Sequence, residues 1–111
     1  KESTVHENYK QRIIKAKDID SVVTGRTHGH PVRGLRNQMT REYTKLEQEG
    51  KSFEELEYLT LGALRKAVQE GDVMNGTVMA GQIAGMISKE QTCKEMIDEM
   101  MEQAKKLLNR E

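Results

Sequence analysis

Residues 76–88, GTVMAGQIAGMIS, form an uncharged, glycine-rich segment in a chain that is otherwise rich in charge. The segment holds three glycines and two alanines, and Gln82 carries its only amide side chain. Glycine and alanine allow another backbone or a flat ring to come close. The segment therefore predicts either a tight elbow between packed helices, with Gln82 at the surface, or a surface that lies against a ligand.

Composition excludes several classes of partner. The 18 basic residues balance 18 acidic ones, so net charge gives no reason to expect binding to nucleic acid or to a membrane surface. No apolar run approaches the roughly 18 residues of a membrane span. The single Cys93 cannot form an internal disulfide, which fits a reducing compartment. We expect a cytoplasmic protein with no nucleic-acid or membrane partner.

The length and the apolar content suggest a piece of something larger. A chain of 111 residues allows one domain at most. Its hydrophobic fraction of 35% is low for an independent globular domain. The chain starts at Lys1 without an initiating methionine. We expect these residues to pack against a partner surface.

The spacing of apolar residues predicts a mostly helical chain with one or two short strands. The expected elements are a helix over 7–17, a strand over 21–24, a loop over 25–34, and helices over 32–48, 52–70 and 88–108. Capping boxes are expected at Ser52 and Ser88. Cys93 falls on the apolar stripe of the last helix, where a buried, inert thiol is expected. A lone strand cannot form a sheet, so its partners are expected outside this chain.

Two clusters could hold a ligand. His28 and His30 have a spacing that could bind a metal, although ordinary loop histidines that form local hydrogen bonds fit the pattern as well. Arg26, Arg33 and Arg36 surround the same loop and could bind phosphate, or could pair with acidic neighbours. No set of nucleophile, base and orienting group can be assembled. The residues alone also fit a small helical interaction module without catalysis.

Two stretches carry a family resemblance. DIDSVVTGRTHGHPVRGLRNQMTREY and GALRKAVQEGDVMNGTVMAGQIAGMISKEQT resemble the C-terminal third of the flavin-dependent enoyl-acyl-carrier-protein reductases, type II, which group with the nitronate monooxygenases. The likeness covers nearly the whole chain. Its most specific part is residues 76–85, and a second anchor spans 20–37.

The resemblance implies an α/β fold, the C-terminal portion of a TIM (β/α)₈ barrel flavoprotein with an added helical region. Such a barrel needs about 250 residues, so residues 1–111 would be a segment of a longer chain. In that reading, residues 1–24 are the end of a barrel helix and strand, and 25–111 form the helical region with a flavin- or substrate-facing loop at 75–88. The catalytic histidine of the family would lie upstream, so no catalytic residue is expected here.

The resemblance also implies a site and a reaction. Met79, Ala80 and Gln82 are expected beside the cofactor FMN, and Met79 and Gly81 beside the substrate. The implied activity is reduction of trans-2-enoyl thioesters in bacterial fatty acid elongation, with NADH or NADPH as co-substrate and a monovalent cation. The implied partners are the remainder of the barrel, an acyl carrier protein and a second subunit in a homodimer. The alternative within the family is a nitronate monooxygenase, which uses FMN and oxygen.

Overall fold

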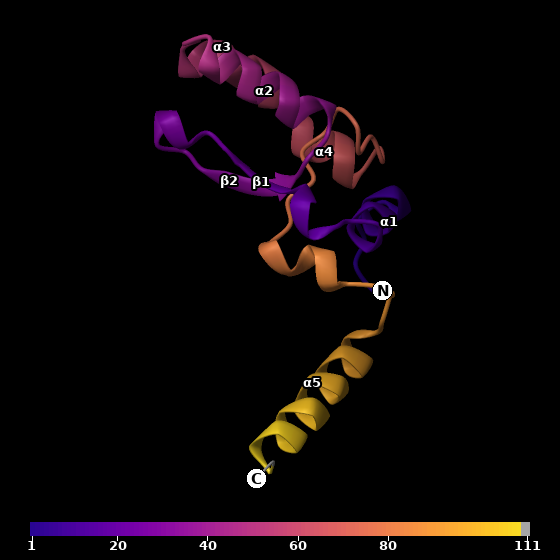
Figure 1. Cartoon of the computed structure of the whole chain (residues 1–111). Coiled ribbons are helices and arrows are strands. Elements are labelled where there is room, and N and C mark those ends of the chain that lie inside the picture. The colour runs from indigo at the N-terminus through magenta and orange to yellow at the C-terminus, as the bar shows by residue number, and fades with distance from the viewer. Residues whose placement is uncertain (110–111) are drawn as a thin grey trace.

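A computed structural model describes residues 1–109, which form a helix-rich body and one projecting helix (Figure 1). Residues 110–111, the end of the predicted helical region, lie outside the described part. In chain order the elements are α1 (Glu7–Ile14), η1 (Asp18–Asp20), β1 (Ser21–Thr24), η2 (Arg26–His28), β2 (Val32–Leu35), α2 (Gln38–Gln48), α3 (Phe53–Thr60), α4 (Ala63–Val68), η3 (Gln82–Met86) and α5 (Cys93–Leu108). None of the helices in this part of the chain is long and apolar enough to cross a membrane.

The predicted strand has its partner inside the chain. β1 pairs antiparallel with β2, with Ser21 opposite Leu35 and Thr24 opposite Val32. The expectation that the helix over 32–48 would begin at Val32 was therefore wrong, because residues 32–35 complete the hairpin. The helix begins only after Asn37, whose side chain accepts a hydrogen bond from the backbone N–H of Thr40.

The predicted helix over 52–70 is two helices. Ser52 caps α3 through Glu55, as expected from the capping box. The helix then breaks because Leu61 is extended and Gly62 adopts a left-handed conformation with φ of 72°. Only glycine enters that region without steric cost, so Gly62 lets α4 start in a new direction.

The first and last helices are also shorter than predicted. α1 ends at Ile14 rather than at residue 17. The last helix begins at Cys93 and is capped by Thr92, not by Ser88, because the side chain of Thr92 accepts from the backbone N–H of Glu95. Cys93 is exposed, so the expectation of a buried thiol was wrong.

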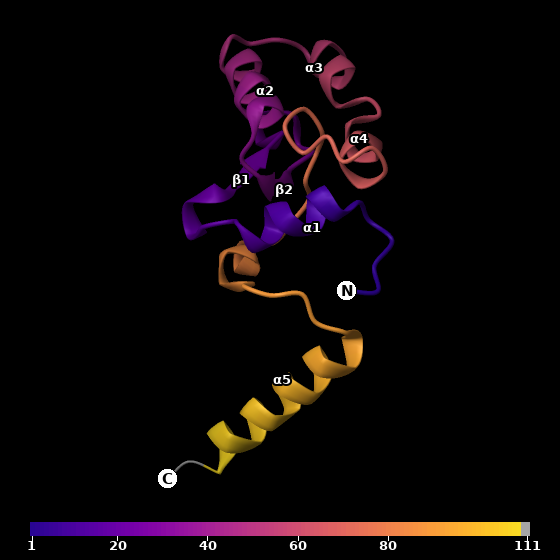
Figure 2. The same cartoon turned by 90° about the vertical axis from the view of Figure 1, so that its right-hand side faces the viewer.

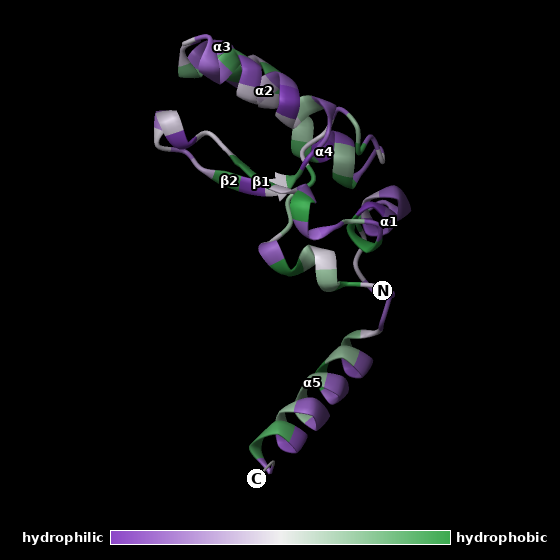
Figure 3. Ribbon diagram, in the orientation of Figure 1, coloured by the Kyte–Doolittle hydropathy of each residue, from purple (hydrophilic) through white to green (hydrophobic). Residues whose placement is uncertain are grey.

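α5 projects away from the body and buries none of its residues (Figures 1 and 2). Its ribbon alternates between apolar and polar residues (Figure 3). The predicted apolar stripe is real, but it faces solvent, with Met96, Ile97, Met100, Leu107 and Leu108 all exposed.

Two small apolar cores hold the body together. The first is formed by Tyr9, Ala16, Leu35, Ala67, Val78 and Ala84. The second lies between α2 and α3 and contains Met39, Tyr43 and Leu56. The segment between α4 and η3 contacts both cores, since Val78 belongs to the first and the backbone N–H of Met39 in the second donates to the carbonyl of Met74 at 3.2 Å.

Residues 73–79, which we call the crossing segment, run from α4 past α2 to β2. The Nδ2 of Asn37 donates to the carbonyls of Val73 at 2.9 Å and Gly76 at 2.7 Å. The backbone N–H of Thr77 donates to Ala63 at 2.9 Å, and that of Leu35 donates to Val78 at 2.9 Å. Hydrogen bonds from three different elements therefore fix this segment.

Glycines in and after the crossing segment allow backbones to meet. A Cβ added to Gly76 would lie 2.6–2.8 Å from backbone atoms of Asp72, Ala67 and Ala63. A Cβ on Gly85 would lie 2.8 Å from the backbone nitrogen of Asp18. The predicted close approach is thus between parts of this chain, at Gly76 and Gly85.

We predict that replacing Asn37 by alanine lowers the free energy of unfolding by about 2–4 kcal/mol, because a buried carbonyl, a partly buried carbonyl and one N–H lose their partner. Urea unfolding followed by circular dichroism measures the loss. Asn75→Ala is the control. Asn75 lies in the crossing segment and is exposed, so its replacement should change the free energy of unfolding by about 0.5 kcal/mol or less. Equal effects of the two variants would contradict the role of Asn37.

We predict a similar contrast between two glycines. Gly76→Ala should cost about 1–3 kcal/mol, because the added methyl group meets backbone atoms that cannot move independently. Gly81→Ala should be close to neutral, because a Cβ there meets nothing within 4 Å. Thermal unfolding of the two variants side by side measures the difference, and a destabilised Gly81→Ala would show that the packing differs from that described.

Candidate functional site

The crossing segment delivers Met79 to the edge of the hairpin. Met79 forms an isolated antiparallel bridge with Gly34. The hydroxyl of Tyr9 donates to the carbonyl of Met79 at 2.6 Å. A Cβ on Gly34 would lie 2.7 Å from the carbonyl oxygen of Val78, so only glycine permits this contact. The backbone of Met79 is thus fixed, while its side chain remains 47% exposed.

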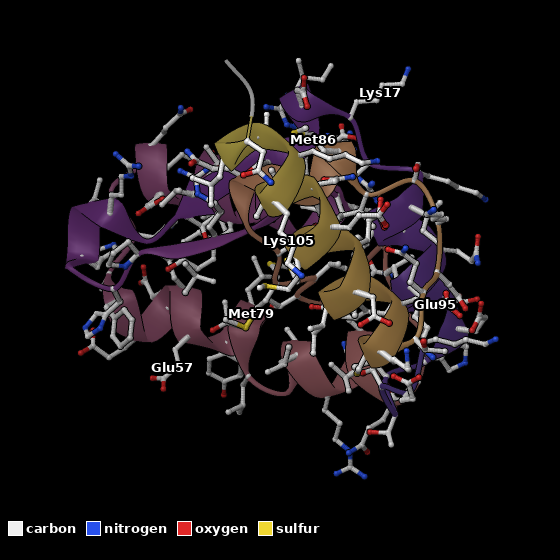
Figure 4. The ribbon with its side chains drawn as sticks, turned by 90° about the horizontal axis from the view of Figure 1, so that it is seen from below. Lys17, Glu57, Met79, Met86, Glu95 and Lys105 are labelled. Atoms are coloured by element: carbon white, nitrogen blue, oxygen red, sulfur yellow. The ribbon has the colours of Figure 1, made fainter. Side chains whose placement is uncertain are left out.

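An apolar groove of about 270 Å³ opens beside Met79, between the hairpin, α2, α3 and the crossing segment. In Figure 4, Met79 lies between the ribbons of the hairpin and α3. The buried side chains of Leu35, Met39, Tyr43 and Val78 form its floor. The other lining residues are Val22, Thr24, His30, Val32, Gly34, Thr40, Phe53, Thr60, Thr77 and Met79. An apolar floor with a few polar groups is typical of small-molecule sites.

The tip of the hairpin closes one end of the groove. The ring of His30 stacks on Phe53 with centroids 4.7 Å apart, and His28 lies against the same ring at 6.1 Å. Thr27 Oγ1 donates to the carboxylate of Glu47 at 2.5 Å. The two predicted histidines therefore contact an aromatic ring, and in residues 1–109 no group of three or more His, Cys, Asp or Glu side chains is placed to hold a metal ion.

The predicted site residues separate into two groups. Met79 borders the groove, whereas Ala80 is half-buried and packs against the first core. Gly81 and Gln82 do not line the groove, and both are exposed. An added Cβ on Gly81 meets no atom within 4 Å, so this chain places nothing against it. Residues 81–82 therefore form an open surface next to Met79.

The predicted arginine cluster does not gather at the groove. Arg33 Nη1 donates to Ser21 Oγ at 2.8 Å. The side chains of Arg26 and Arg36 are exposed. No Lys or Arg lines the groove in the described part of the chain, so the groove offers no cradle for a phosphate.

Two tyrosines next to the site have altered acidity. Burial raises the pKa of the Tyr9 hydroxyl, which donates to the carbonyl of Met79. Burial also raises the pKa of Tyr43 in the groove floor, and the nearby negative charge of Glu47 adds to the effect. Both hydroxyls therefore keep their protons at neutral pH, where they can donate hydrogen bonds.

Sequence reasoning missed most of the groove. Met39 and Tyr43 lie in the predicted helix over 32–48, but Phe53, Thr60 and His30 come from elements that are distant in sequence. The β-branched residues of 21–24 and the valine at 32, on either side of a loop with three glycines, were a hairpin signal that could have placed Val22 and Val32 on one face.

The comparisons with known proteins agree with this fold. The sequence profile of the nitronate monooxygenase family matches residues 1–103. The structure of FabK from Thermotoga maritima superposes with a TM-score of 0.87 and 38% identity, over 94% of this chain and 33% of the FabK chain. A mutant of the same FabK gives a TM-score of 0.77 and 35% identity, over 96% and 31%. A probable nitronate monooxygenase from Staphylococcus saprophyticus is 25% identical over 109 residues, 98% of this chain and 30% of the relative.

The chain belongs to the nitronate monooxygenase family. The predicted fold class, part of an α/β TIM-barrel protein with a mostly helical segment, is confirmed by the match to FabK and by the helix-rich structure. The chain spans about a third of the length of these relatives. The predicted division at residues 24 and 25, and the position of the segment at the C-terminal end of the barrel, stay predictions.

We predict that Tyr9 makes the fold sensitive to alkaline pH. A pKa raised above the ordinary value of about 10 means that the folded state binds the phenolic proton more tightly than the unfolded chain. This contribution to stability is present below pH of about 10 and is lost as pH rises through the folded pKa. Between pH 8 and 11.5, the urea concentration at the midpoint of unfolding should fall less steeply with rising pH in Tyr9→Phe than in the unchanged protein. An equal slope in both would contradict the role of Tyr9.

Proposed function

We propose that the protein carrying this chain is an FMN-dependent oxidoreductase that reduces trans-2-enoyl thioesters with NADH or NADPH. The observation that carries the proposal is the apolar groove that opens beside Met79. Family membership and the similarity to FabK support the flavin-dependent class. The thioester substrate is what the resemblance to the enoyl-acyl-carrier-protein reductases implies, and the apolar lining of the groove supports it.

The groove suits the hydrocarbon part of an acyl group. Its floor is made of buried aliphatic, methionine and tyrosine side chains, and it has no charged Lys, Arg, Asp or Glu in its lining. Burying methylene groups there is favourable by about 0.8 kcal/mol each. The hydroxyls of Thr24 and Thr77 in the lining offer polar contacts to a thioester.

The chain fits the ring of FMN better than its phosphate. Gly81 has open space where a side chain would be, and Gln82 is exposed next to it, so a planar ring could lie on this surface with the Gln82 amide at its edge. The groove has no basic cradle, so phosphate would be held by other parts of the protein. When bound, FMN supplies the hydride-transfer chemistry. The role of this chain would be to position the substrate through Met79 and the groove.

Nitronate oxidation is the second candidate, because the family profile and the staphylococcal relative carry that name. An alkyl nitronate is small and polar compared with a long acyl chain. A bound nitronate would leave most of the groove empty, so the turnover of nitronate should not depend on the length of the groove.

The decisive experiment uses the full protein that carries these residues, loaded with FMN. We expect enoyl-thioester-dependent oxidation of NADH or NADPH, followed at 340 nm. Oxygen consumption with a propyl nitronate and no nicotinamide would instead support the second candidate. Absence of thioester reduction in the flavin-loaded protein would refute the proposed function.

We predict that narrowing the groove changes chain-length preference. Thr60 is exposed on α3 at the rim, so Thr60→Trp should fill space without disturbing either core. Turnover of a trans-2-dodecenoyl thioester should fall by about tenfold or more relative to a crotonyl thioester. Glu57→Trp is the matched control on the same helix, since Glu57 is exposed and does not line the groove. An equal effect on both substrates would contradict the acyl assignment.

A further inference from the structure

The floor of the groove contains a buried tyrosine whose ring and hydroxyl have different surroundings. Tyr43 follows Met39 by one turn of α2, so both side chains lie on the helix face that forms the floor. Tyr43 is only 5% exposed and packs with Met39 and Leu56 in the second core. The ring therefore belongs to the core, and the phenolic oxygen is the polar end of a side chain that is otherwise surrounded by apolar groups.

In the described part of the chain, no group accepts a hydrogen bond from the Tyr43 hydroxyl. The carboxylate of Glu47, one turn further along α2, accepts from Thr27 Oγ1 at 2.5 Å instead. Thr40 Oγ1 is also engaged, because it donates to the carbonyl of Asn37 at 3.0 Å. The hydroxyl of a buried tyrosine usually finds a partner. Tyr43 therefore has a donor available for a ligand.

The Tyr43 hydroxyl is accessible from the groove, which this residue lines. Every completely buried side-chain nitrogen or oxygen in residues 1–109 has a hydrogen-bond partner, so the unpaired hydroxyl cannot be completely enclosed. A Cβ built on Gly25 would lie 3.6 Å from the Tyr43 oxygen and would collide with the carbonyl of His30. Gly25 also has a φ of 82°, which glycine adopts without strain. The hairpin thus brings backbone without a side chain next to the hydroxyl.

The Tyr43 hydroxyl is a neutral donor in an apolar setting. Burial raises the pKa of Tyr43, and the negative charge of Glu47 adds to the effect, so the proton stays on the oxygen at neutral pH. No Lys or Arg of the described residues lines the groove, so an anion would be buried there without a compensating charge, which is costly. The best match is a neutral acceptor oxygen attached to a hydrocarbon chain. A thioester carbonyl has this combination, whereas an alkyl nitronate carries a negative charge.

We propose that the Tyr43 hydroxyl donates a hydrogen bond to the carbonyl oxygen of the acyl thioester and thereby positions the double bond that is reduced. The ligand rests on the proposed function, and the site rests on the unpaired, buried donor. When a hydride reaches the β-carbon, the electron pair of the C=C bond moves towards the α-carbon and the carbonyl oxygen, and a proton then adds at the α-carbon. A donor at that oxygen stabilises the developing charge and keeps its own proton. Tyr43 is thus a substrate-binding residue, distinct from the group that supplies the proton.

The test compares two ligands that differ only at the carbonyl. Butyryl-N-acetylcysteamine is a saturated thioester, and S-butyl-N-acetylcysteamine has a methylene group in place of the thioester carbonyl. The dissociation constants of both ligands are measured by calorimetry on the full, FMN-loaded protein and on its Tyr43→Phe variant. Tyr58→Phe is the matched control, because it removes the same hydroxyl from a tyrosine that is 90% exposed and does not line the groove.

We expect Tyr43→Phe to reduce the preference for the thioester over the thioether by about tenfold or more, and Tyr58→Phe to leave it unchanged. The stretching frequency of a ¹³C-labelled thioester carbonyl should be lower in the unchanged protein than in Tyr43→Phe, because a hydrogen bond weakens the C=O bond. The turnover number with a crotonyl thioester should fall by about tenfold or more in Tyr43→Phe. The urea midpoint should be the same in the two variants, since the Tyr43 hydroxyl has no partner in the described residues to lose.

Three results would overturn the proposal. The first is an unchanged thioester preference in Tyr43→Phe, which would mean that the hydroxyl is only hydrated or that Thr24 or Thr77 holds the carbonyl. The second is a urea midpoint of Tyr43→Phe well below that of Tyr58→Phe, which would show that the hydroxyl has a structural partner in the full protein. The third is nitronate binding that depends on Tyr43 when thioester binding does not. Because both ligands are bound without turnover, failure of thioester reduction with an intact Tyr43 effect would refute the proposed function separately.

Discussion

The arrangement of this fold depends on one buried amide. Asn37 is 4% exposed, and its side chain caps α2 while donating to two carbonyls of the crossing segment. A buried carbonyl without a partner is costly, so these contacts fix where α4 ends relative to where α2 begins. The position of Val78 in the first core, and of Met79 at the groove, follows from that attachment.

α2 then divides two kinds of surface. Its apolar side forms the floor of the groove, and its polar side carries Arg41 and Lys45. Because one rigid helix carries both, their relative position is set by the helical period rather than by flexible loops.

Glycine in this chain serves two different needs. At Gly34 and Gly76 it allows backbones to meet at distances that a Cβ would block, which joins β2 to the crossing segment and that segment to α4. At Gly81 no neighbouring atom of the chain explains it. The composition of residues 76–88 could show only that something comes close. Which glycine meets the chain's own backbone, and which faces open space, depends on how other segments of the chain pack against it.

The sequence by itself determined the helical character, the capping box at Ser52 and the apolar face of α5, since periodicity and capping are local properties. Resemblance in two motifs was enough to indicate the family. Only the tertiary structure decided that residues 32–35 are a strand, that α3 and α4 are separate, and that Phe53 and His30 close a groove beside Met79. Strand pairing and grooves are made by contacts between distant residues, and local patterns do not contain that information.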